Sequence, residues 1–164
     1  MRAPHPNPRL AAGIACAAAI AALASCGGSS NSGSTSPKEF QSEANQVCRD
    51  SQQQFDRIQR IQPHTADQTE KQAAALADVS QQALDNLHQI EPPGDLKAGY
   101  SRYLAAREKD LGFIEDGRDA AASKDINAYV RATHRAAAQA PVRRQLALQL
   151  GLRFCSRPSV TLGK

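Results

Sequence analysis

The residues best suited to chemistry in this 164-residue chain are its histidines and cysteines. His64, His88 and His134 lie in the larger C-terminal part, and imidazole is a common metal ligand and a general base near neutral pH. A di-iron site in a helical bundle needs two Glu-x-x-His motifs, and the sequence contains none. The three histidines also lack the paired spacing of a zinc site. We therefore expect no metal site.

Haem is the remaining cofactor that these histidines could hold. Because the only methionine is Met1, a Met/His pair of axial ligands is excluded, while His88 with His134 stays open as a His/His pair. The sequence has no Gly-x-Ser-x-Gly motif, no telling Cys/His pair and no Gly-rich phosphate loop. We expect no cofactor, no catalytic residue and no enzymatic activity.

Cys26 stands at an abrupt change in composition. Residues 1–25 hold two arginines, no acidic residue and an apolar stretch from Leu10 to Ala24, which is typical of a secretory signal peptide. The apolar stretch is shorter than the roughly 20 residues that a transmembrane helix needs. Residues 26–36 are mostly Gly and Ser, a composition that favours a flexible tether.

The apolar stretch ends in Leu23-Ala24-Ser25-Cys26, which resembles the lipobox of bacterial lipoproteins. The resemblance implies that the thiol of Cys26 is diacylated and that the signal peptide is removed just before it. Two acyl chains hold a protein stably on a bilayer. We therefore expect lipidation at Cys26 and a location at the extracytoplasmic face of the cell membrane. The alternative is an ordinary secretory signal in which the cysteine stands by chance.

The net charge argues against a nucleic acid as partner. Loss of the signal peptide removes two arginines and no acid, which leaves 18 Lys and Arg against 16 Asp and Glu. Nucleic-acid binding requires a concentrated basic face. We interpret two charged clusters as solvated surfaces, with contact to anionic lipid headgroups as the alternative for the basic one: the acidic Glu115, Asp116 and Asp119, and the basic Arg143, Arg144, Arg153 and Arg157.

Apolar residues recur at steps of three and four, so the periodicity predicts helices and no strand. The expected helices cover 38–62, 66–90 and 96–122, and a fourth runs from 126 to a C-terminal cap at Gly151. Their N-caps are expected at Ser36, Thr65 and Asp125. Pro141 predicts either a kink in the fourth helix or the start of a fresh one.

Four helices of about 25 residues with short turns predict an all-α, antiparallel, up-down-up-down four-helix bundle. We expect it to span residues 37–157, with a disordered tail at 158–164. The core should be rich in alanine and poor in aromatic residues. Arg107 falls on the apolar face of the third helix, where we interpret it as a side chain that extends out to solvent at the edge of the apolar stripe.

Two cysteines remain after Cys16 is lost with the signal peptide and Cys26 is lipidated. An exported domain meets an oxidising environment, so we predict a disulfide between Cys48 and Cys155. In the expected bundle the first and fourth helices are neighbours, and Gly151 lets the chain reverse toward the first helix. The alternative is two buried free thiols.

A resemblance to a family follows from motifs placed along most of residues 23–156. After the lipobox and tether come "ANQVC" (44–48), "EPPGDL" (91–96) and "GLRFC" (151–155). In this order the chain resembles a group of small actinobacterial lipoproteins and secreted proteins. The resemblance implies a disulfide-tied helical bundle outside the cell membrane and points to no particular activity.

These observations predict a membrane-tethered, non-enzymatic binding or interaction module, whose partner is an envelope protein or a small ligand. The alternatives are a structural or stress-protective envelope protein and, third, a bundle that binds haem or another small ligand. A cavity lined by His88, His134, Arg107 or Tyr100 would favour ligand binding. A closed core packed with alanine would favour contact through the surface alone.

Overall fold

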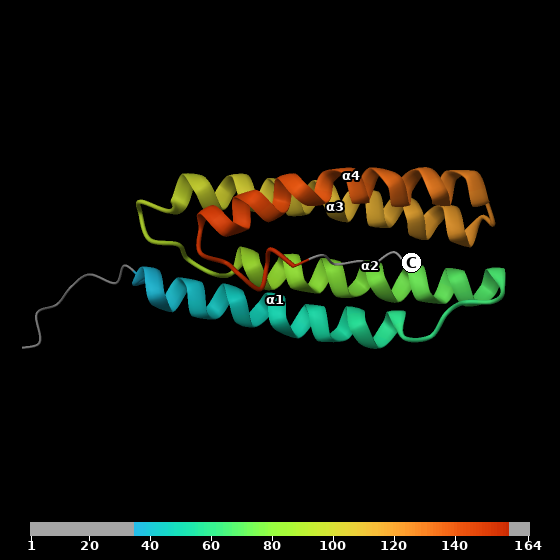
Figure 1. Ribbon diagram of the computed structural model, residues 1–164, viewed down its shortest axis with the longest axis horizontal. Helices are drawn as coiled ribbons and strands as arrows, with labels where there is room; N and C mark the ends of the chain where they lie inside the picture. The colour runs from blue at the N-terminus through green and yellow to red at the C-terminus, as the bar shows by residue number, and fades with distance from the viewer. Residues whose placement is uncertain (1–34, 158–164) are drawn as a thin grey trace, which may run out of the picture. The chain divides into compact units, whose positions relative to one another are not determined.

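The computed structural model describes residues 35–157, which form four helices and, within that range, no strand (Figure 1). The helices are α1 (Pro37–Gln59), α2 (Ala66–His88), α3 (Lys97–Ala122) and α4 (Ile126–Gln149). Short connections make successive helices antiparallel, so the expected all-α four-helix arrangement is confirmed. The expected signal peptide, the lipidation site at Cys26, the tether up to residue 34 and the tail at 158–164 lie outside the described residues.

The predicted N-caps are present on three helices. The hydroxyl of Ser36 accepts a hydrogen bond from the backbone N–H of Glu39, whose carboxylate accepts one from the Ser36 N–H. The hydrogen bond from the Ser36 hydroxyl is the main reason that the pKa of Glu39 is lowered. Thr65 and Gln68 form the same reciprocal capping box, and Asp125 caps α4. These caps stabilise N–H groups that have no partner inside their own helix.

Pro141 lies within α4, which continues through it to Gln149, so the expected fresh helix is not formed. A proline in a helix removes the hydrogen bond to the carbonyl four residues earlier. That carbonyl belongs to Ala137, and both Pro141 and Ala137 are exposed, so water can replace the lost donor.

The first and fourth helices do not pack against each other, contrary to our expectation. Among the four helices, α1 packs on α2, α2 on α3 and α3 on α4. The chain after α4, residues 150–157, crosses back toward α1 (red in Figure 1) and takes the place of a direct contact. We name these residues the C-terminal segment. The bundle is therefore two helical hairpins joined through α2 and α3, with a short segment connecting the outer helices.

Gly151 makes the reversal into the C-terminal segment possible. Its φ is +74°, a left-handed conformation that favours glycine. The N–H groups of Gly151 and Leu152 donate to the carbonyls of Leu148 and Ala147, the two hydrogen bonds of a Schellman motif. A Cβ atom at position 151 would lie 2.5 Å from Nε2 of Gln41, so that side chain would have to move and its hydrogen bond to the carbonyl of Leu150 would be disturbed. The expected C-terminal cap is confirmed.

The Cys48–Cys155 disulfide ties the C-terminal segment to α1, as predicted. Their Cα atoms are 5.0 Å apart and the sulfurs are bonded. Side chains of α1 hold the same segment by hydrogen bonds to its backbone: Gln41 donates to the carbonyl of Leu150, and Asn45 accepts from the N–H of Phe154. The motifs around residues 44–48 and 151–155 thus form one docking contact.

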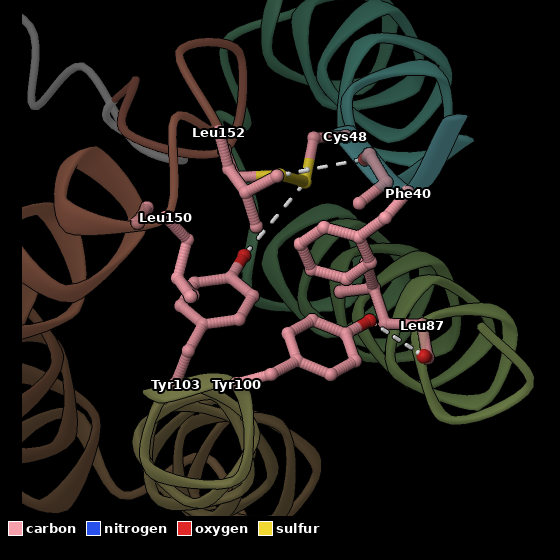
Figure 2. Packing of buried hydrophobic residues seen from close by; sticks show 10 residues of the cluster. Phe40, Cys48, Leu87, Tyr100, Tyr103, Leu150 and Leu152 are labelled. Carbon is pink, nitrogen blue, oxygen red and sulfur yellow. Dashed lines mark hydrogen bonds between the residues drawn. A yellow bond between two sulfur atoms is a disulfide. The ribbon is translucent and has the colours of Figure 1, made fainter. Parts of the chain in front are cut away.

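The largest buried side chains surround this contact (Figure 2). Phe40 meets Tyr100 edge-to-face with ring centroids 4.9 Å apart, and Tyr100 stacks on Tyr103. Leu87 and Leu152 complete the fully buried set. Alanines dominate the buried positions elsewhere, including Ala73, Ala77, Ala120, Ala121 and Ala132. The core is thus alanine-rich as expected, and three of its buried aromatic residues, Phe40, Tyr100 and Tyr103, gather at the end where the disulfide lies.

Candidate functional site

A cavity of about 150 Å³ lies among α2, α3 and α4. Its walls are mainly apolar, and α1 contributes no residue to them. Large apolar side chains come from α2 and α3, while α4 contributes three alanines that leave space in front of them. The apolar residues of the walls are Ala73, Leu76, Leu111, Phe113, Ile114, Gly117, Ala136, Ala137 and Ala140, together with the ring of Tyr129.

Beside the cavity, α3 and α4 pack closely. Gly117 on α3 faces Ala132 on α4, and a Cβ atom at 117 would be only 3.7 Å from that of Ala132, so the two helices approach closely. In a closed bundle, α1 would cover the side of α4 that faces α2. Here α1 packs on α2 alone and contributes no residue to the cavity.

The polar end of the cavity consists of Arg107, Asp110 and Arg143. Nε of Arg143 donates to Oδ2 of Asp110 over 2.5 Å, and its Nη1 donates to the carbonyl of Cys155 over 3.1 Å. Arg143 is only 2% exposed. Its guanidinium therefore joins α4, α3 and the disulfide-bonded C-terminal segment. We expected Arg143 in a solvated helix end, and this is wrong, because the segment folds back over it; Arg144, Arg153 and Arg157 are exposed.

Arg107 and Asp110 are also buried, at 9% and 8% exposure. The expectation that Arg107 extends to solvent is therefore wrong: α4 packs against this face of α3 and keeps the guanidinium at the cavity wall. Oδ1 of Asp110 is buried and has no hydrogen-bond partner among residues 35–157. The polar end thus holds a carboxylate that is only half satisfied beside two guanidinium groups.

Burial opposes charge on both partners of the Asp110–Arg143 pair. It raises the pKa of Asp110, while the two arginines act in the opposite direction. Burial also lowers the pKa of Arg143, and the positive charge of Arg107 adds to this effect. Tyr103 lies next to the cluster, and burial raises the pKa of its phenol. Each charge in the cluster therefore depends on its neighbours in place of water.

The structure does not bring His88 and His134 together. Nε2 of His88 lies 3.2 Å from Oε1 of Glu108, and both side chains are about half exposed. His134 is exposed, and its neighbour Arg135 pairs with Asp116, about two turns further along α3 than Glu108. His64 is exposed in the α1–α2 connection. None of the three lines the cavity, and residues 35–157 contain no cluster of His, Cys, Asp or Glu that could hold a metal ion.

The structure also shows where Tyr100 and the acidic cluster on α3 lie. Tyr100 lies in the aromatic core, where its hydroxyl donates to the carbonyl of Leu87 over 2.7 Å, so it does not line the cavity (Figure 2). The acidic cluster forms exposed ion pairs, as expected for a solvated face: Arg118 contacts Glu115 and Asp119, and Arg135 contacts Asp116.

Sequence reasoning missed Asp110 and the burial of Arg143. A signal for Asp110 was present, because Tyr103, Arg107, Asp110 and Ile114 are spaced by four, three and four residues and so share one helix face. Two opposite charges within an apolar stripe indicate a buried pair or a polar site. The partner on α4 had no comparable signal, since Arg143 lies beside Arg144 and resembles it in sequence.

Comparison with protein-family models, with curated proteins and with solved structures finds no match to this chain. None of the helices described between residues 35 and 157 combines the length and the apolar character needed to cross a membrane.

Proposed function

We propose that this protein is a lipid-anchored module at the extracytoplasmic face of the cell membrane, and that its helical bundle binds a small, largely apolar molecule without catalysing a reaction. The observation that carries the proposal is the cavity among α2, α3 and α4, with apolar walls and one polar end. A small apolar cavity of about this size can hold one aromatic ring or a short hydrocarbon chain, and because this one is partly open to solvent, the rest of a larger molecule can extend out of it. The anchor and the family resemblance rest on the sequence around Cys26 and on the motifs at 44–48 and 151–155.

The cavity favours ligand binding over a purely structural role in the envelope. A bundle that acted through its surface alone would need only a closed core, whereas this bundle keeps a space lined by Arg107. The charged residues there are held in place, since Arg143 binds both Asp110 and the backbone of Cys155. Such an arrangement suits recognition of a polar group better than transfer of a proton or electron pair.

Filling the cavity tests the proposal. The neutral fluorophore 1-aminoanthracene should bind the full mature protein, and Ala140→Leu should weaken binding by about tenfold or more, because its added methylenes occupy the apolar space. Ala138→Leu is the matched control, since Ala138 is exposed on the same helix and does not line the cavity. Equal binding by both variants, with both shown to be folded by circular dichroism, would contradict the proposal.

The anchor is tested separately at Cys26. Cys26→Ala should move the protein from the detergent phase to the aqueous phase, or leave it unprocessed, because the acyl chains supply the membrane affinity. Cys26→Ala protein that still partitions with detergent and still carries a fatty acyl group would show that the lipid is attached elsewhere or that the lipobox assignment is wrong.

A further inference from the structure

We propose that the ligand of this cavity is an amphipathic monoanion, with a carboxylate or a comparable singly charged group bound by Arg107 and an apolar body among α2, α3 and α4. The inference rests on the proposed function, whose site it specifies further.

The first argument is the charge of the cavity wall. Its lining includes two guanidinium groups, from Arg107 and Arg143, and one carboxylate, from Asp110. Arg143 pairs with Asp110 and makes a further interaction, so Arg107 is the guanidinium of the wall that has no hydrogen bond or ion pair among the described residues. Arg107 therefore has room for an anionic partner at the cavity wall, where its nitrogens are not sealed from water. One negative charge on a ligand would supply that partner.

The second argument is the position of Arg107. It extends from α3 one turn before Asp110, and only 9% of its surface is exposed. Among residues 35–157 it makes no hydrogen bond or ion pair, so its N–H donors are left for a bound group. A guanidinium binds a carboxylate through two parallel hydrogen bonds, a geometry that a neutral alcohol cannot reproduce.

The third argument concerns the size and charge of the ligand. Leu76, Leu111, Phe113 and Ile114 line the space beyond the polar end, so the rest of the ligand should be apolar. The carboxylate of Asp110 would repel a second negative charge beside Arg107. The cavity should therefore prefer a monoanion over both a neutral analogue and a dianion with the same apolar body.

Three eight-carbon probes separate these cases: octanoate, 1-octanol and octyl phosphate, each used to displace 1-aminoanthracene from the full mature protein at pH 7.5. Octanoate should displace the fluorophore at a concentration about tenfold or more below that needed for 1-octanol. Octyl phosphate, which is mainly a dianion at this pH, should be weaker than octanoate. Octanoate and 1-octanol of equal potency would overturn the charge inference while leaving the proposed function intact. Absence of any fluorophore binding would overturn both.

A pair of variants assigns the effect to one side chain. Arg107→Gln should remove the preference for octanoate over 1-octanol, because the side chain proposed to bind the carboxylate has lost its charge. Arg102→Gln is the control, since Arg102 is exposed on the same helix and does not line the cavity. If Arg107→Gln does not fold, Arg107→Lys keeps the charge without the planar fork and should lower the preference only in part. A preference for octanoate that is unchanged in the folded Arg107 variant would contradict the assignment.

Discussion

The side chain of Asn45 on α1 forms hydrogen bonds both within its own helix and with the C-terminal segment. Its Oδ1 accepts from the N–H of Phe154 over 2.8 Å, and its Nδ2 donates to the carbonyls of Gln41 and Gly151. A single amide thus satisfies backbone groups on both α1 and the C-terminal segment, which would otherwise be poorly hydrated. This gives a physical reason for an asparagine three residues before Cys48, because it sets the backbone that brings Cys155 to the disulfide.

The buried tyrosines make the stability sensitive to alkaline pH. Burial raises the pKa of both Tyr100 and Tyr103 above the ordinary value of 10.0. The folded state then holds protons that the unfolded state releases, so the free energy of unfolding should fall as pH rises above about 10. Below that pH both states are protonated and the two phenols add no pH dependence.

Urea denaturation at steps between pH 8 and pH 11 measures this effect. Tyr100→Phe should be less stable than wild type at pH 8, because it loses the hydrogen bond to Leu87, and should lose less stability as pH rises. Reversal of the pH jump by dilution to pH 8 controls for alkaline damage to the disulfide. A wild-type and a Tyr100→Phe curve with the same slope against pH would contradict the assignment to this phenol.

At the scale of the elements, local sequence explains where most helices begin. The hydroxyl and carboxyl caps at Ser36, Thr65 and Asp125 act on backbone groups within three residues, so they are visible without the fold. The C-terminal ends are less well defined by sequence. We expected the first two helices to reach Gln62 and Ile90, whereas they end at Gln59 and His88, because the chain must already turn before Pro63 and Pro92.

Pro141 lies in the interior of α4, a position that normally disfavours a continuous helix. A proline in a helix interior costs about 3 kcal/mol, yet α4 continues through it. The buried Arg143 and Ala147 after the proline belong to the same packed face as Ala132 before it. Tertiary packing of α4 on α3 therefore maintains one helix where the sequence permitted two.

At the scale of the whole molecule, the disulfide connects the first helix to the segment that follows the last one. Cys48 and Cys155 are 107 residues apart, and the chain-entropy model gives about 4.7 kcal/mol for a loop of about 100 residues. The typical stability of a domain is about 5–15 kcal/mol. Since α1 does not pack on α4, the bond and the docked C-terminal segment are the connection between them.

The variant Cys48→Ala with Cys155→Ala should therefore be less stable by about 2–5 kcal/mol, measured by urea denaturation of the non-reduced protein. Wild type treated with reductant should lose a similar amount. Intact mass after alkylation checks the bond itself, because the native protein should gain no label on these two cysteines until it is reduced. Two labelled thiols in the native protein, or a double variant as stable as wild type, would contradict this account.

The sequence by itself determined the four helices, three of their N-caps, the glycine cap at 151 and the Cys48–Cys155 pair. These follow from periodicity, from hydrogen bonds between residues close in the chain and from the number of cysteines that lie outside the expected signal peptide and lipidation site. Its prediction of a lipid anchor at Cys26 depends on motif resemblance and stays a prediction.

Tertiary structure alone decided whether the outer helices α1 and α4 pack on each other and which polar side chains become buried. Whether α4 packs on α1 depends on the summed contacts of both hairpins and of the C-terminal segment, none of which is local. The same packing closes over Arg107 and Arg143, which resemble exposed arginines in the sequence. The cavity is lined by residues of three helices that are far apart in the sequence, so the pattern of no single helix could indicate it.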